Sequence, residues 1–270
     1  MLKLRVLTAV ILIPLVILGI FHLSNLFFFL ATLIIFCMAA WEWARLSGWS
    51  SLWLKLFYVL LMIAGMMVIN LIPAGNIITI AIGAFWWSLV ALWILKARRQ
   101  VTLVALPQWS ILLSGFLVLL PCWHAILLLR RVDPALLLYM LLMIWICDSA
   151  AYFGGRLWGK RKLAVNISPN KTFEGLYAGF VVTILASFAA AWFVFTPYVI
   201  QLSWLLPVIP LIAAVVIGDL FESALKRMQN LKDSGHLLPG HGGLLDRIDS
   251  LTAAAPVFTC VMIFLRQAGY

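Results

Sequence analysis

The chain is dominated by about nine apolar runs of membrane-spanning length, and this feature limits its fold more than any other. Hydrophobic residues make up 65% of its 270 residues and charged residues only 10%, whereas globular domains average roughly 25% charged residues. A helix needs about 20 apolar residues to cross the hydrocarbon core of a bilayer. We therefore predict an all-α, polytopic integral membrane protein. The predicted spans are residues 6–22, 25–41, 55–72, 76–95, 109–129, 134–153, 174–196, 203–221 and 250–266.

The positive charges predict how these spans are oriented. The first run follows Lys3 and Arg5 as in a signal peptide, but it lacks a clear cleavage site and leads into another run, so we expect a retained helix. Lys and Arg collect in short cytoplasmic loops. With the N-terminus inside, every Lys and Arg except Arg130, Arg131 and Arg266 falls on the inner side. We predict nine spans, N-in/C-out. The net charge of +10 is then largely a topology signal, and nucleic-acid binding has little support.

The two halves of the chain differ in where their polar residues lie. Residues 1–130 carry few polar groups within the runs, which is typical of scaffold helices. In residues 131–270 charged residues enter the helix ends, and the longest predicted cytoplasmic loops are 154–173 and 222–249. We see no internal repeat and no low-complexity linker. The prediction is a single membrane domain, residues 1–270, whose second half carries the catalytic helices and loops.

The segment from Ser223 to Asp249 holds most of the residues that could perform chemistry. It combines bases, carboxylates and flexible glycines beside apolar runs. Its histidines, His236 and His241, and the four cysteines of the chain lack zinc spacing, so we expect neither zinc nor a disulfide framework. His241 lies in Pro239-Gly-His-Gly-Gly243, a turn whose backbone N–H groups could approach an anion. This composition favours a site for phosphates and a metal.

Asp219 extends this segment back into an apolar run. Glu222, Ser223 and Lys226 follow it at i+3, i+4 and i+7, so the four side chains share one face of a helix. An acid in a span is expensive unless it faces a cavity, a metal or a partner. The alternative is a helix end whose carboxylates only pair with Lys226 near the headgroups.

Further acids lie at the ends of two other predicted spans. Asp148 lies just before the inner end of one predicted span. Asp246 and Asp249, spaced i and i+3, lie at the start of the last span. Carboxylates from different helices can bind one cation together. Mg²⁺ prefers oxygen ligands, and it usually also keeps water and phosphate oxygens.

The loop 154–173 adds a second cationic segment. Ser168-Pro169 has the pattern of an N-cap and first turn, so we predict that a helix begins there. A helix N-terminus beside Lys171 is a natural phosphate site. The alternative, for Lys160 to Lys162, is that these cations only follow the positive-inside rule.

Trp41-Glu42-Trp43 near the N-terminus leaves two interpretations open. The tryptophans fit an interfacial belt. Glu42 is then either an ordinary surface acid or a distant part of the site.

Taken together, these motifs resemble the signature of the CDP-diacylglycerol synthases (phosphatidate cytidylyltransferases). The signature reads Ser-x-x-Lys-Arg, Lys-Asp-Ser-Gly-His, Pro-Gly-His-Gly-Gly and Asp-Arg-Ile-Asp, here at residues 223–227, 232–236, 239–243 and 246–249. The likeness extends to residues 41–43, 148–149, 168–169, 171–172 and 174–175, so it covers essentially the whole chain. The length is close to that of the short bacterial members.

The resemblance implies a nucleotidyltransferase of phospholipid biosynthesis that joins CTP and phosphatidate to give CDP-diacylglycerol and pyrophosphate. It implies a location in the bacterial cytoplasmic (inner) membrane, with the site facing the cytoplasm. Mg²⁺ is the implied cofactor; a second cation such as K⁺, and a homodimer, are left open. In-line attack on the α-phosphorus of CTP needs positioning and charge neutralisation more than a protein nucleophile.

The resemblance also implies the roles of individual residues. The implied catalytic residues are Asp219, Asp246, Lys226 and Asp148. The implied metal ligands are Asp219, Asp246, Asp249 and Glu222. The implied substrate contacts are Ser223, Arg227, Lys232, His241, Arg247, Lys171 and Ser168.

Two other functions compete with this one. A transporter also carries buried acids, but it predicts polar groups near mid-membrane in paired halves, whereas this chain clusters them at one face. A CTP-dependent polyprenol kinase is the nearest enzymatic alternative.

Overall fold

The computed structural model describes residues 2–98, 106–194, 205–235 and 242–267, which fold into helices and one small hairpin. The helices are α1 (Leu2–His22), α2 (Asn25–Leu46), α3 (Leu52–Leu71), α4 (Gly75–Ala97), α5 (Gln108–Val132), α6 (Pro134–Trp158), α7 (Phe173–Val194), α8 (Val208–Met228) and α9 (Leu245–Gln267). The hairpin, between α6 and α7, consists of β1 (Lys162–Ala164) and β2 (Ser168–Thr172). Apart from this hairpin, the regular structure in these residues is helical, as predicted.

Eight helices, α2 to α9, are long and apolar enough to span a membrane, and the part of α1 over Leu12–His22 forms a shorter apolar helix. These findings confirm the prediction of a polytopic membrane protein. The helices cover the predicted spans, but α2, α6 and α9 each extend about five residues beyond a predicted end, and α8 begins at Val208 and continues to Met228. Its last turns are polar, and they extend the helix because their side chains pair with other parts of the protein. The orientation of the spans and the division into two halves stay predictions.

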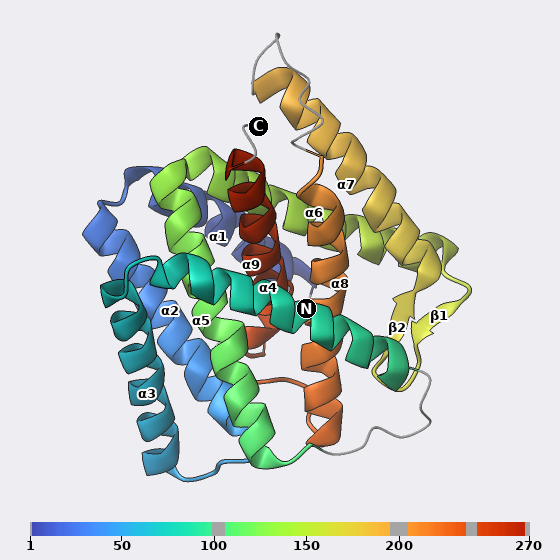
Figure 1. Cartoon of the computed structure of the whole chain (residues 1–270). Helices are drawn as coiled ribbons and strands as arrows, with labels where there is room; N and C mark the ends of the chain where they lie inside the picture. Colours follow the sequence, from blue (N-terminus) through green and yellow to red (C-terminus); the bar gives the residue numbers. More distant parts are fainter. Residues whose placement is uncertain (1, 99–105, 195–204, 236–241, 268–270) are drawn as a thin grey trace.

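Figure 1 shows how the other helices are arranged around α8 and α9, which carry four charged residues each. Helices α8 and α9 lie side by side near the centre, with α2, α3 and α5 on one side and α7 and the hairpin on the other, while α6 passes behind them. Helix α4 crosses in front and packs against α5, α8 and α9.

Buried tryptophans join the outer helices to this centre. Trp43 Nε1 donates a hydrogen bond of 2.7 Å to the carbonyl of Ile111, which ties α2 to α5. Trp87 Nε1 donates to the carbonyl of Thr252 at 3.1 Å and ties α4 to α9. An unpaired N–H in an apolar interior costs several kcal/mol, so these bonds fix which face of each helix points inward.

The prediction that a helix begins at Ser168 is wrong. Ser168 and Pro169 lie in β2, which pairs antiparallel with β1, and α7 begins five residues later, at Phe173. The side chain of Thr172 supplies the cap, since its Oγ1 accepts a hydrogen bond from the N–H of Gly175 at 3.2 Å. Pro169 is tolerated because a two-stranded sheet has open edges where no N–H is needed.

Helices α6 and α7 approach each other closely at small residues, and this contact places the hairpin. A Cβ on Gly175 would lie 2.6 Å from the carbonyl oxygen of Ala151 and 3.1 Å from the Cα of Gly155. Small residues allow such backbone contact between membrane helices. The hairpin that joins the two helices is therefore held beside the second half of α6.

We predict that Gly175→Ala destabilises the protein by about 1–3 kcal/mol, because the added methyl group meets backbone atoms that cannot move away. The midpoint of thermal unfolding in detergent should fall. Gly19→Ala is the matched control, since a Cβ there meets only the end of the Leu23 side chain, at 3.7 Å. Equal midpoints for the two variants would contradict the assignment of Gly175 to the helix contact.

Candidate active site

Helices α6, α8 and α9 bring three carboxylates together. Ser223 Oγ donates to Asp219 Oδ1 at 3.2 Å, and Ser250 Oγ donates to Asp148 Oδ1 at 3.4 Å. The charges of Asp148 and Asp219 both act on Asp249, and that of Asp219 also acts on Asp148. We call Asp148, Asp219 and Asp249 the acid centre. Acids from three helices therefore lie close enough together for their charges to interact.

Lys171 of β2 reaches this acid centre from the hairpin. Its Nζ forms an ion pair with Asp219 Oδ2, and its charge also acts on Asp148 and Asp249. Three carboxyl groups therefore share the positive charge of Lys171. Acids at membrane helices are costly unless they face a partner, so this group of acids suits a further cation.

Lys226 forms a second, more buried cluster with the other two predicted acids. Its Nζ lies 2.5 Å from Asp246 Oδ1 and 3.2 Å from Glu222 Oε1. The charge of Asp249 also acts on Glu222, so this lysine cluster adjoins the acid centre. Pairing with Lys226, the alternative from the sequence, thus holds for Glu222 but not for Asp219, which pairs with Lys171.

The segment before α9 holds the second oxygen of Asp246. Asp246 Oδ2 accepts hydrogen bonds from the N–H groups of Ser234 and Gly243 at 3.0 and 2.9 Å. Ser234 Oγ lies 3.0 Å from the same oxygen. One oxygen of Asp246 therefore faces Lys226 and the other faces the loop.

The remaining predicted site residues lie farther out. Arg227 Nε donates to the carbonyl of Ile167 at 3.4 Å, which joins the end of α8 to the hairpin. Ser168 is half-buried in β2, while Lys232 and Arg247 are exposed. His241, a predicted substrate contact, lies outside the described residues.

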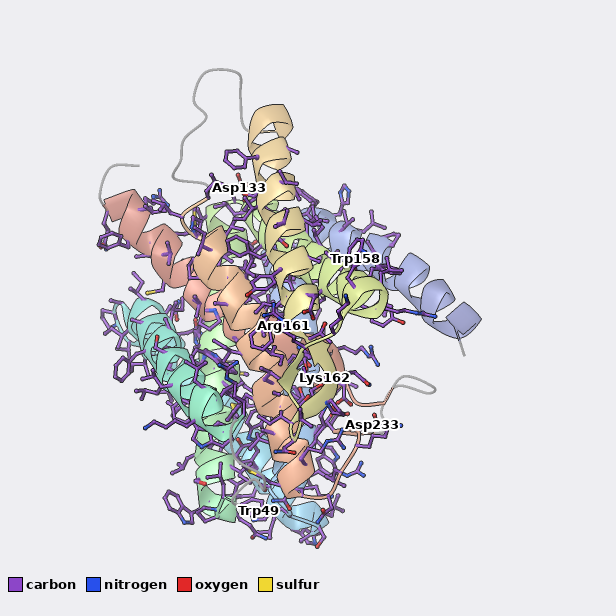
Figure 2. The ribbon with its side chains drawn as sticks, turned by 90° about the vertical axis from the view of Figure 1, so that its right-hand side faces the viewer. Trp49, Asp133, Trp158, Arg161, Lys162 and Asp233 are labelled. Carbon is purple, nitrogen blue, oxygen red and sulfur yellow. The ribbon has the colours of Figure 1, made fainter. Side chains whose placement is uncertain are left out.

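Glu174, in the first turn of α7, is a structural anchor, a role that the sequence did not predict. Its Oε2 accepts from the N–H groups of Lys160 and Arg161 at 3.0 and 3.1 Å, and its Oε1 accepts from Arg161 Nε at 3.0 Å. The hydrogen bond and the charge of Glu174 raise the pKa of Arg161. Figure 2 shows Arg161 and Lys162 on the same side of the molecule as Asp233, between Asp133 and Trp49.

The described side chains do not form a ready-made metal site. Within residues 2–98, 106–194, 205–235 and 242–267, no group of three His, Cys, Asp or Glu residues is arranged to hold an ion. The four cysteines are free, as expected. The acid centre still has three carboxyl groups, which supply the oxygen donors that Mg²⁺ prefers. Asp148, Asp219 and Asp249 are therefore the described side chains that would supply oxygen ligands if a hard cation were bound here.

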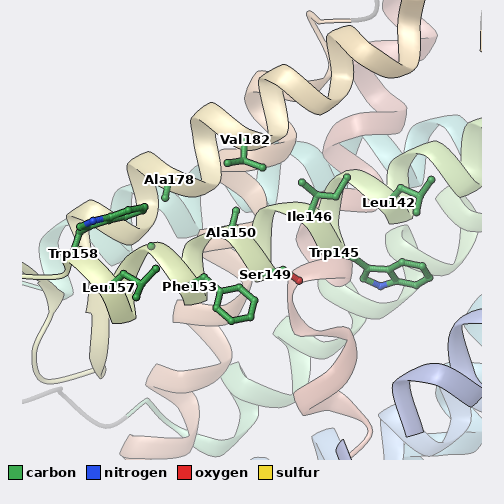
Figure 3. A pocket seen from close by; sticks show the side chains of 11 residues that line it. Leu142, Trp145, Ile146, Ser149, Ala150, Phe153, Leu157, Trp158, Ala178 and Val182 are labelled. Atoms are coloured by element: carbon green, nitrogen blue, oxygen red, sulfur yellow. The ribbon is translucent and has the colours of Figure 1, made fainter. Parts of the chain in front are cut away.

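An apolar groove of about 470 Å³ runs along the outer surface of α6 and α7. Figure 3 shows its lining, which includes Trp145, Ala150 and Phe153 of α6 and Val182 of α7. Its polar side chain is Ser149, the residue after Asp148. The groove thus places an apolar surface beside the helix segment that carries one acid of the centre.

Fold and site define a polytopic membrane protein with a charged centre among its helices. The model of the cytidylyltransferase family matches residues 3–265, and the chain belongs to this family. A relative from Pseudomonas aeruginosa named phosphatidate cytidylyltransferase is 37% identical over 97% of each chain. A relative of the same name from Haemophilus influenzae is 32% identical over 98% of this chain and its own full length. One from Brucella suis, also so named, is 36% identical over 78% of this chain and 71% of its own.

We predict that Lys226→Met destabilises the protein by about 3–5 kcal/mol, because it leaves two carboxylates facing each other in a buried site. Lys96→Met, at an exposed position of α4, should change stability by no more than about 0.5 kcal/mol. Denaturant unfolding in mixed micelles measures both changes. If Lys226→Met proved as mild as Lys96→Met, the buried ion-pair cluster would be wrong.

Proposed function

We propose that this protein transfers the cytidylyl group of CTP to phosphatidate and releases pyrophosphate and CDP-diacylglycerol. The observation that carries the proposal is the acid centre beside the lysine cluster, in a chain of the cytidylyltransferase family. Relatives that match nearly the whole chain are named phosphatidate cytidylyltransferase. Carboxylates and lysines in this arrangement suit a reaction that moves a charged phosphoryl group.

The proposed reaction is an in-line displacement at the α-phosphorus of CTP. A phosphate oxygen of phosphatidate forms the new P–O bond, and the bond to the pyrophosphate oxygen breaks. Lys171 and Arg227 would bind phosphate oxygens, and Lys226 would hold Asp246 in place or bind a phosphate itself. The triphosphate would compete with Asp219 for Lys171, so substrate binding would free that carboxylate.

Mg²⁺ is the cofactor that we propose, held by Asp148, Asp219 and Asp249. It would supply charge neutralisation at the phosphate oxygens. Asp246 and Glu222, the other predicted ligands, are engaged by Lys226 in this structure. A second cation such as K⁺, and a homodimer, stay predictions.

The lipid substrate accounts for the placement of the site in a membrane protein. Phosphatidate lies in the bilayer and CTP in the cytosol, so we propose that the site opens at the cytoplasmic face of the inner membrane. A bacterial location is supported by the bacterial source of the relatives. Family membership argues against a transporter, and a polyprenol kinase would give a phosphorylated alcohol instead of a liponucleotide.

We predict that purified protein in detergent, given labelled CTP, phosphatidate and Mg²⁺, releases pyrophosphate and forms a labelled liponucleotide. Asp219→Asn should lower the rate by about 100-fold or more, because it removes charge from the acid centre. The matched control is Asp133→Asn. Asp133 caps the N-terminus of α6, whereas Asp148 of the acid centre lies in the second half of that helix, and Asn is an equally good cap. Folded wild-type protein that forms no liponucleotide would refute the proposed function.

A further inference from the structure

Glu42 of α2 is a buried carboxylate that the proposed reaction does not use. Its side chain is 1% exposed. Glu42 Oε1 accepts a hydrogen bond from the N–H of Leu244 at 3.0 Å, and Oε2 accepts one from the N–H of Leu245 at 2.8 Å. Of the two interpretations from the sequence, a surface acid is therefore excluded.

These contacts place Glu42 at the N-terminus of α9. The first N–H groups of a helix have no partner within it, and a carboxylate is favourable at this end. Helix α9 begins at Leu245, and the preceding Leu244 has no side-chain acceptor. The acceptors that a capping residue normally supplies therefore come from another helix.

Ser234 connects Glu42 to Asp246. Its Oγ lies 3.1 Å from Glu42 Oε2 and 3.0 Å from Asp246 Oδ2, so the two carboxylates share one hydroxyl group. The loop between α8 and α9 thus converges on the same two acids from both of its ends. Ser234 lies on the α8 side, and Gly243 to Leu245 lie on the α9 side.

Two glycines of the loop allow this convergence. A Cβ on Gly235 would lie 2.0 Å from Glu42 Oε1, and a Cβ on Gly243 would lie 1.9 Å from Ser234 Oγ. Real Cβ atoms essentially never come so close. The loop backbone is therefore packed directly on the Glu42 carboxylate.

We propose that Glu42 is a positioning residue for Asp246. It fixes the start of α9 and both sides of the preceding loop, so that Asp246 presents one oxygen to Lys226. The inference rests on the proposed function only in assigning a task to Asp246, since the contacts themselves are independent of any reaction. Outer residues of this kind typically change activity by about 10–100-fold when altered.

The test is Glu42→Gln, which keeps the size of the side chain but replaces one acceptor oxygen by an NH₂ group that cannot accept from a backbone N–H. We expect hydrogen exchange in peptides from residues 242–250 to become about tenfold faster or more, measured without substrate. The kcat for liponucleotide formation should fall about 10–100-fold, with the KM for CTP within about threefold of wild type.

Tyr139→Phe is the matched control. It removes a buried hydrogen bond of 2.6 Å to Ser187, about 13 Å along α6 from Asp148. This variant should keep the wild-type kcat and the wild-type exchange of residues 242–250. A general loss of stability would instead affect both variants alike.

Ser234→Ala keeps the experiment decisive if Glu42→Gln does not fold. It removes only the shared hydroxyl group and should shift exchange and kcat in the same direction by a smaller factor. Where Glu42→Gln does fold, the loss of kcat in the double variant should be less than the product of the two single losses, because both residues act on the same loop.

Unchanged exchange in Glu42→Gln would overturn the inference, as would faster exchange with an unchanged kcat in active enzyme. An inactive wild-type protein would count against the proposed function alone, since the exchange experiment needs no substrate. Faster exchange confined to residues near 242–250 would then still support the contact that Glu42 makes.

Discussion

The pairing of buried carboxylates with two lysines is the interaction on which the rest of this structure depends. Acids within membrane helices are costly unless they face partners. Asp219 is paired with Lys171, and Glu222 and Asp246 are paired with Lys226. Removing either lysine would leave carboxylates facing one another. The helices α6, α8 and α9 must therefore keep their mutual positions, and the surrounding fold can be understood as the means of keeping them.

The surrounding helices fix these positions through polar contacts and close backbone contacts at apolar interfaces. Trp87 ties α4 to α9, and the close contact of Gly175 with α6 places the hairpin that carries Lys171. Glu42 adds a contact from α2 to the start of α9. The first half of the chain, which reads as scaffold in the sequence, thus acts on the site directly. In a bilayer such contacts replace the hydrophobic drive that water gives to soluble proteins.

Much of this was predictable from local sequence patterns, and the rest depended on tertiary contacts. The apolar runs gave the spans because their length is set by the bilayer, and helical spacing placed Ser223 beside Asp219. The prediction of a helix start at Ser168 was wrong because Ser168-Pro169 has the local pattern of such a start, whereas pairing with β1 places these residues in a strand and the helix begins at Phe173. The division of the acids between two lysines, and the role of Glu42, join segments far apart in the chain.

Manganese binding, followed by electron paramagnetic resonance, tests most directly whether the acid centre binds a divalent cation together with CTP. Wild-type protein should bind Mn²⁺ saturably, more tightly with CTP, and with a magnetic coupling to phosphorus that shows the metal and the nucleotide in contact. Asp148→Asn and Asp249→Asn should each weaken this binding by about tenfold or more, because each removes a carboxylate ligand. Equal Mn²⁺ binding in the wild-type protein and both variants would contradict the central role of the acid centre.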